Sequence, residues 1–177
     1  MHRGFVALAV VAGLLVAGCS KDVPATVQLY ARVPVPAVPD RTAPMGATAG
    51  DGQYWATKVV VKDGQLVFSF AQAFFGPTCA RELGADRCTN DFGTNEADAP
   101  NPAGYGTITI TPSELTTVTV FAPDGQNYAI DGSELARLVG GAAPAKSAPS
   151  YFRYTPGPYL LTMSGGTAST ASEVSLS

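Results

Sequence analysis

Alternation of apolar and polar residues predicts short β-strands along most of the chain. The clearest run contains Leu66, Phe68 and Phe70, which alternate with smaller or polar residues and therefore share one face of a strand. Residues 57–62 have the same β-rich character, and Asp63-Gly64 between the two runs is typical of a type I′ turn. We therefore predict a β-hairpin whose inner face belongs to the core.

Further strands and two short helical segments follow from the same reading. Strands are predicted at residues 27–33, 105–110, 117–121, 126–130, 151–154 and 159–164. Pro123-Asp124-Gly125 favours a second tight hairpin turn. Thr111-Pro112-Ser113-Glu114 has the spacing of a capping box and predicts one helical turn. A longer helix is predicted from Asp131 through Val139, where Gly140-Gly141 would end it.

Residues 27–164 are long enough to form a single domain with its own core. Residues 71–104 lack the strand pattern, apart from an expected helical turn at residues 79–83. Residues 165–177 are rich in Gly, Ser, Thr and Ala, so we expect a loose C-terminal tail, although Val174 and Leu176 could add an edge strand. About seven or eight short strands with one or two short helices predict an all-β fold, a small antiparallel β-sandwich or open barrel, with α+β as the alternative.

The first twenty residues follow a different pattern. His2 and Arg3 form a polar head, residues 5–16 are apolar or small throughout, and a thiol follows at Cys19. This arrangement is typical of an export signal. Its last five residues, Leu15-Val16-Ala17-Gly18-Cys19, resemble the lipobox of bacterial lipoprotein precursors. The resemblance implies cleavage between Gly18 and Cys19 and attachment of fatty acyl chains, such as palmitate, at Cys19.

The lipobox resemblance also implies a place in the cell. Residues 1–18 would be a signal peptide, Cys19 the mature N-terminus, and residues 19–26 a tether. Each buried methylene contributes about 0.8 kcal/mol, so two or three acyl chains would hold the protein on the cell membrane, facing outside the cytoplasm. A plain secretory signal and a retained membrane anchor are the alternatives, although an anchor needs about 20 apolar residues.

Charge and histidine content exclude several functions. Loss of Arg3 with the signal would leave 10 of the 11 basic residues against 14 acidic ones, a formal net charge of −4, which argues against nucleic-acid binding. The single histidine, His2, would leave as well. Ser-His-Asp catalysis and His-ligated metals would then be excluded, and no cofactor motif is present.

Two cysteines remain beside Cys19, namely Cys79 and Cys88. An exported protein meets oxidising conditions, so we predict a disulfide between them that contributes about 2–3 kcal/mol. A two-cysteine zinc site and a redox-active pair are weaker alternatives, since the other zinc ligands and the Cys-x-x-Cys spacing are missing.

Acidic residues collect near the cysteines. The acidic side chains considered as calcium ligands are Asp86, Asp91, Glu96 and Asp98. Their spacing matches no EF-hand loop, so a solvated loop is the main expectation and no metal is assigned. The same carboxylates are the basis of a remote alternative, a carboxylate-based hydrolase, but nothing fixes their separation.

Aromatic residues recur along the predicted strands. Packing in the core or at its rim is the main expectation, because strand tyrosines bury the ring and leave the hydroxyl wet. A partner-binding surface would instead expose several rings together, and Trp55, Tyr151 and Tyr159 are the candidates for it.

These observations favour a lipid-anchored, non-catalytic envelope protein that binds a protein or glycan partner. A carrier of a lipid or other apolar ligand, similar to some actinobacterial lipoproteins, is one alternative and would need a large apolar cavity between sheet and helix. The layout also resembles small lipoproteins that phages and prophages express to block a second infection. Such proteins act by binding.

Overall fold

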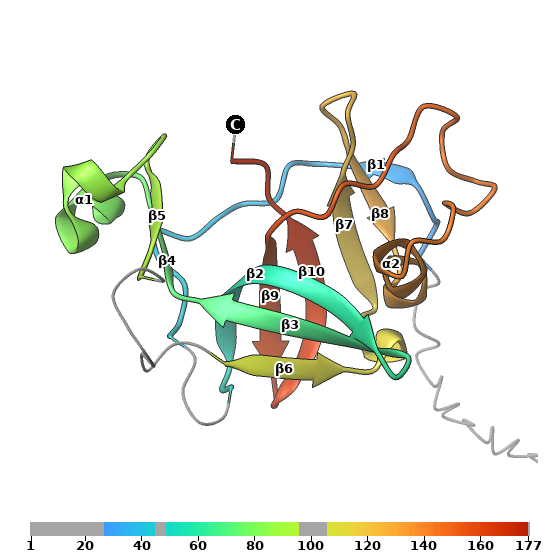
Figure 1. Cartoon of the computed structure of the whole chain (residues 1–177), viewed down its shortest axis with the longest axis horizontal. Coiled ribbons are helices and arrows are strands. Elements are labelled where there is room, and N and C mark those ends of the chain that lie inside the picture. The colour runs from blue at the N-terminus through green and yellow to red at the C-terminus, as the bar shows by residue number, and fades with distance from the viewer. Residues whose placement is uncertain (1–26, 45–48, 96–105, 177) are drawn as a thin grey trace, which may run out of the picture.

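A computed structural model describes residues 27–44, 49–95 and 106–176 (Figure 1). The chain is mostly β-sheet with two short α-helices, as the sequence predicts. The strands are β1 (Ala31–Val33), β2 (Gly52–Lys62), β3 (Gln65–Ala71), β4 (Ala73–Phe75), β5 (Phe92–Thr94), β6 (Thr107–Ile110), β7 (Thr117–Phe121), β8 (Asn127–Ile130), β9 (Tyr159–Ser164) and β10 (Thr167–Glu173). The helices are α1 (Pro77–Leu83) and α2 (Gly132–Val139), with 3₁₀ turns η1 (Ala85–Arg87) and η3 (Pro112–Glu114).

Eight strands form one sheet in the order β1-β8-β7-β10-β9-β2-β3-β6, and β4 and β5 form a separate pair. The main sheet is not wholly antiparallel, because β10 runs parallel to β7. A parallel pair needs a crossover connection. Here β8, α2, a long loop and β9 separate the two strands in sequence.

The β2–β3 hairpin forms as predicted. Its strands pair up to Lys62 and Gln65. Asp63 and Gly64 both have positive φ angles, 52° and 75°, as a type I′ turn requires. Leu66, Phe68 and Phe70 are buried, which confirms the predicted inner face.

The second hairpin and both predicted helical segments are also present. β7 and β8 pair in antiparallel register. Asp131 caps α2, because its Oδ1 accepts a hydrogen bond of 2.8 Å from the Glu134 N–H. At η3 the Thr111 N–H donates to Glu114 Oε2 over 2.9 Å, which completes a capping box.

The main core lies inside the curled sheet. Figure 1 shows β3 and β6 crossing in front of β9 and β10, so that two parts of one sheet face each other. Phe68 of β3 meets Tyr159 of β9 edge-on, with ring centroids 6.1 Å apart. Helix α2 adds Leu135 and Leu138 to the same core.

A small lobe covers part of the sheet's outer face. Successive side chains of a strand alternate between faces, so Tyr54 and Ala56 enter the main core while Trp55 points outward. Phe75 and Phe92 pack on Trp55, with centroid distances of 5.4 and 5.1 Å. These rings belong to β4 and β5, beside α1 and the Cys79–Cys88 disulfide. The predicted disulfide is therefore present, and it staples the lobe that buries Trp55.

Several predictions of local structure are wrong. Residues 71–104 do not lack strands, because β4 and β5 pair there as a two-stranded sheet. Residues 165–177 are not a loose tail, because β10 lies between β7 and β9 inside the sheet. Residues 151–154 form no strand. The first strand keeps only Ala31–Val33, since Tyr30 has a φ of 63° and begins the strand with a turn. The predicted signal peptide of residues 1–18 and the predicted tether of residues 19–26 lie outside the described residues.

Candidate functional site

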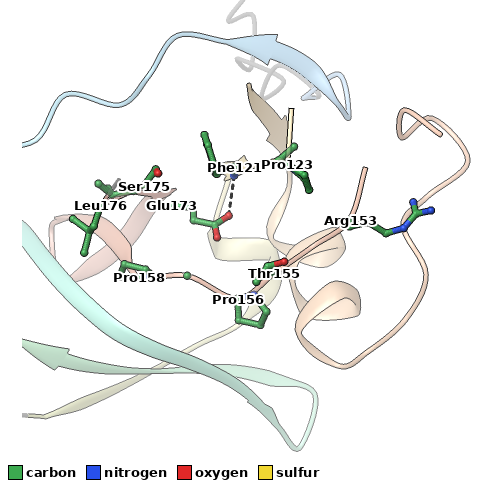
Figure 2. A pocket seen from close by; sticks show the side chains of 12 residues that line it. Phe121, Pro123, Arg153, Thr155, Pro156, Pro158, Glu173, Ser175 and Leu176 are labelled. Carbon is green, nitrogen blue, oxygen red and sulfur yellow. Dashed lines mark hydrogen bonds between the residues drawn. The ribbon is translucent and has the colours of Figure 1, made fainter. Parts of the chain in front are cut away.

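Two surface clefts meet where β10 ends. The first, about 350 Å³, lies between the β7–β8 turn, residues 153–158 and the segment after β10 (Figure 2). The second, about 360 Å³, lies between the β7–β8 hairpin, the same C-terminal segment and the extended chain after β1. Both clefts are lined by the same four residues, Phe121, Glu173, Val174 and Ser175.

The sheet places the Glu173 carboxyl between the clefts. Glu173 is the last residue of β10 and pairs with Tyr159 of β9. Its Oε2 accepts a hydrogen bond of 2.8 Å from the Phe121 N–H. The Gly157 N–H also donates to this carboxyl. A Cβ at position 157 would lie 2.5 Å from Glu173 Oε1, so a larger residue there would force the Glu173 carboxyl to move.

Burial dominates the chemistry of this carboxyl. Glu173 is only 5% exposed, and burial raises its pKa to about 7, although the hydrogen bonds from Phe121 and Gly157 oppose the shift. Among the described residues, no ion pair joins it to a basic side chain. Arg153 lines the first cleft, but Figure 2 shows its guanidinium turned away from Glu173.

Two tyrosine hydroxyls lie near this carboxyl. Tyr154 and Tyr159 hydrogen-bond through their hydroxyl oxygens, which are 3.0 Å apart. Burial raises the pKa of Tyr154 to about 12 and that of Tyr159 well above its usual value, and the Glu173 charge adds to both shifts. Both hydroxyls therefore remain protonated at neutral pH, and Glu173 is the group that titrates there.

The walls of the clefts are largely uncharged. Proline and aliphatic side chains predominate, namely Pro123, Pro156, Pro158 and Leu176 in the first cleft and Val35 and Pro36 in the second. The arrangement combines a fixed carboxyl acceptor with apolar walls. It is suited to bind a ligand that carries both a polar and an apolar part.

The other buried glutamate, Glu134, is fully used within the fold. Its Oε1 accepts hydrogen bonds from the Tyr30 hydroxyl at 2.6 Å and from the Ala145 N–H at 2.7 Å. Its Oε2 pairs with Arg137. Glu134 therefore connects α2 to the segment before β1, through Tyr30, and to the loop after α2, through Ala145. Its role is structural.

The predicted aromatic surface is not formed. Trp55 and Tyr159 are 1% and 0% exposed, because the small lobe covers the first and the main core contains the second. Tyr151 is 48% exposed, and its hydroxyl lies 2.9 Å from that of Tyr128. The hypothesis is wrong for Trp55 and Tyr159, and packing in the core, the main expectation, is confirmed for both.

The weak calcium candidates are not brought together in the described part of the chain. Asp86 and Asp91 are exposed. Glu96 and Asp98 lie outside the described residues, as do Gly18 and Cys19. Within residues 27–44, 49–95 and 106–176, no three His, Cys, Asp or Glu side chains are grouped as metal ligands.

Sequence reasoning missed Glu173. The residue lies in the stretch interpreted as a loose tail, among small polar residues. One signal was present, since Glu173 is the only charged residue between Tyr154 and the C-terminal Ser177. A lone carboxyl is more often exposed to solvent than buried, so this signal alone would not have identified the site.

Comparison with models of protein families, with curated proteins and with solved structures finds no match for this chain. In the described residues, no helix has the length and apolar character needed to cross a membrane.

Proposed function

We propose that this chain is a lipid-anchored, non-catalytic envelope protein that binds a protein or glycan partner outside the cytoplasm. The anchor rests on the lipobox at Leu15-Val16-Ala17-Gly18-Cys19. The Cys79–Cys88 disulfide supports an oxidising compartment. The observation that carries the binding function is the pair of apolar-walled clefts that share Glu173.

Binding accounts for the site better than catalysis does. A hydrolase of the carboxylate type needs a second convergent carboxyl with a shifted pKa. The hydroxyls of Tyr154 and Tyr159 near Glu173 are neutral at physiological pH, and Glu134 is used by Arg137 and Tyr30. The site therefore offers one acceptor between shaped apolar walls.

The packing of α2 counts against the carrier alternative. A carrier would need a large apolar cavity between the sheet and the helix. Leu135 and Leu138 of α2 are instead buried among the side chains of the main core. The clefts described above lie elsewhere, beside the end of β10, and both are open.

The anchor can be tested by intact mass of the protein extracted from membranes, with and without reductant. We expect a mass increase from acyl chains on Cys19 and a further increase of about 2 Da on reduction, from one disulfide. Cys19→Ala should lose the acyl mass and leave the membrane fraction. Equal membrane retention of Cys19→Ala and the unchanged protein would contradict the anchor.

The binding face can be tested in cells with a photo-crosslinking residue. Thr155 lines the first cleft and Val35 the second, and both are exposed. Lys58, exposed on β2, is the matched control position. We expect one discrete adduct from Thr155 or Val35 and none from Lys58. The same adducts from all three positions, or none from any, would contradict binding at the clefts.

A further inference from the structure

We propose that the clefts around Glu173 bind an aliphatic cation, an ammonium or guanidinium group on an apolar stem, as a lysine or arginine side chain of a partner or a free amine presents it. This inference rests on the proposed binding function and specifies the chemistry of what is bound. Four features of the site support it, namely free acceptor capacity, uncompensated charge, apolar walls and a fixed orientation.

The carboxyl of Glu173 has acceptor capacity left for a ligand. A carboxylate offers about four lone-pair sites. Hydrogen bonds from the Phe121 and Gly157 N–H groups occupy two of them and hold the group in one orientation. Figure 2 shows the carboxyl between Phe121 and Thr155, facing the first cleft. A donor that enters the cleft would meet an acceptor that is already oriented.

The two buried glutamates provide an internal comparison. Glu134 is 3% exposed and has an arginine, Arg137, as its ion-pair partner. Glu173 is 5% exposed and has no such partner in the described residues, yet it lines two clefts. A buried carboxylate without a cation is costly. A cation brought by a ligand would supply for Glu173 what Arg137 supplies for Glu134.

The apolar walls of the clefts favour a ligand whose charged group is attached to an aliphatic chain. Pro156, Pro158 and Leu176 line the first cleft, and Val35 and Pro36 the second. Lysine and arginine bury their methylene stems along apolar surfaces of this kind. A divalent metal ion fits less well, because calcium takes six to eight oxygen ligands and this site has one carboxyl.

Proton and cation would compete for the same carboxyl. The groups that face Glu173 are the Phe121 and Gly157 N–H groups and the neutral hydroxyl pair of Tyr154 and Tyr159. Glu173 alone among them titrates near pH 7. Binding should therefore weaken roughly 30-fold from about pH 8 to about pH 5.5, which is the fall in the ionised fraction of a group with a pKa of about 7.

The experiment titrates the full chain, extracted in a neutral detergent, with n-pentylammonium, and uses n-pentanol as the uncharged control. The readout is the NMR shift of the Phe121 and Gly157 backbone amides. We expect saturable shifts with the amine, little response to the alcohol, and the pH dependence given above. An equal response to amine and alcohol, or amine binding that does not change with pH, would overturn the proposal.

Two variants assign the binding to this carboxyl. Glu173→Gln should abolish amine binding, whereas Glu82→Gln, which changes the net charge equally at an exposed position of α1, should leave it unchanged. Thr155→Trp narrows the first cleft without altering Glu173, so it should weaken binding even if Glu173→Gln fails to fold. Unchanged amine binding by Thr155→Trp and by a folded Glu173→Gln would sink the assignment.

A peptide arm separates the two sources of the cation. A short peptide with lysine flanked by valines should bind more tightly than n-pentylammonium if a partner side chain is the ligand, and the norleucine peptide should not bind. Equal affinity of amine and peptide would assign the site to a free amine. A cleft adduct in cells without any amine or lysine-peptide binding would overturn this inference and leave the proposed function intact. Binding of the amine without any crosslinked adduct in cells would support the cation site and contradict the proposed binding of a partner at the clefts.

Discussion

Glu134 and Glu173 illustrate how burial alone does not decide the role of an acidic side chain. Glu134 accepts hydrogen bonds from Tyr30 and Ala145 and pairs with Arg137, so its charge is compensated inside the fold. Glu173 receives hydrogen bonds from the Phe121 and Gly157 N–H groups and has no ion-pair partner among the described residues, and burial raises its pKa to about 7. The first residue stabilises the structure, and the second makes it sensitive to pH.

The raised pKa of Glu173 predicts a fall in stability as pH increases. Between about pH 4.5 and pH 7 the native state binds more protons at this residue than the unfolded state does, so the free energy of unfolding decreases with rising pH. The decrease is at most about 3 kcal/mol, since one pKa unit corresponds to about 1.4 kcal/mol. Denaturant unfolding at a series of pH values measures it.

Glu173→Gln is the variant that isolates this effect, because it removes the titrating group and keeps the shape of the side chain. We expect the slope between about pH 4.5 and pH 7 to flatten in Glu173→Gln and to persist in the control variant Glu82→Gln. An unaltered slope in a folded Glu173→Gln would show that another group is responsible.

Helix α2 depends on close contact with η3 at Gly132. A Cβ at this position would lie 2.1 Å from the Pro112 carbonyl oxygen and 2.8 Å from Leu115 Cβ, and backbone cannot yield as a flexible side chain does. Gly132→Ala should therefore lower the free energy of unfolding by about 1–3 kcal/mol. Gly50→Ala is the control, because nothing lies within 4 Å of a Cβ there. Thermal unfolding of both variants would measure the difference, and equal melting temperatures would contradict the contact.

Because β10 lies inside the sheet, we expect a proline substitution in this strand to lower the stability of the protein strongly. Ala171 is 0% exposed and pairs with Leu161 on one side and Val118 on the other. Ala171→Pro removes a ladder donor in the middle of the sheet and should cost at least about 3 kcal/mol. Leu176→Pro, beyond the last strand, should stay within about 0.5 kcal/mol of the unchanged chain. Far-UV circular dichroism during urea unfolding would compare them, and a stable Ala171→Pro would refute the central position of β10.

An element could be predicted from the sequence when its turn and its apolar pattern are local to it. The β2–β3 hairpin was predictable, since Asp63-Gly64 carries its turn and the strands alternate large apolar residues. β10 was not, because its buried positions include Ala168 and Ala171, which bury little area and resemble a flexible tail in sequence. Residues 151–154 gave the opposite error, because Phe152 is buried in the main core from an irregular segment.

The candidate site depends on contacts that no local pattern records. Glu173, Gly157 and Phe121 are brought together by the parallel pairing of β7 with β10 and by the loop before β9. Sequence patterning identified the strands at β7 and β9 but not their arrangement. The clefts form only in that arrangement, so sequence patterning could not predict them.

At the scale of the whole molecule, two cores share the same strands. β2 and β9 each contribute to the main core on one face and to the small lobe on the other, through Trp55 and Leu160. The small lobe has few buried residues of its own, and the Cys79–Cys88 disulfide, which joins two segments within the lobe, stabilises it.

Because the two cores share β2 and β9, we expect the small lobe and the main sheet to unfold together while the disulfide is intact. Trp55 is the only tryptophan, so its fluorescence reports on the small lobe, while far-UV circular dichroism reports on the main sheet. The two transitions should coincide in the disulfide-bonded protein. In Cys79→Ser/Cys88→Ser we expect the fluorescence transition to occur first, because the lobe loses about 2–3 kcal/mol of stabilisation. Transitions that remain coincident and shift together would show that the lobe does not unfold separately.

The order in which the chain is made gives the position of β10 a further consequence. A ribosome delivers residues from the N-terminus onward, so Thr167–Glu173 emerges after β7 and β9, the two strands between which it lies. Until then β7 and β9 each present an open edge, so the sheet cannot close before β10 has been made. If the chain is exported as we propose, a secretion pathway that threads unfolded polypeptides across a bilayer would receive it before this sheet has closed, and folding would be completed on the far side.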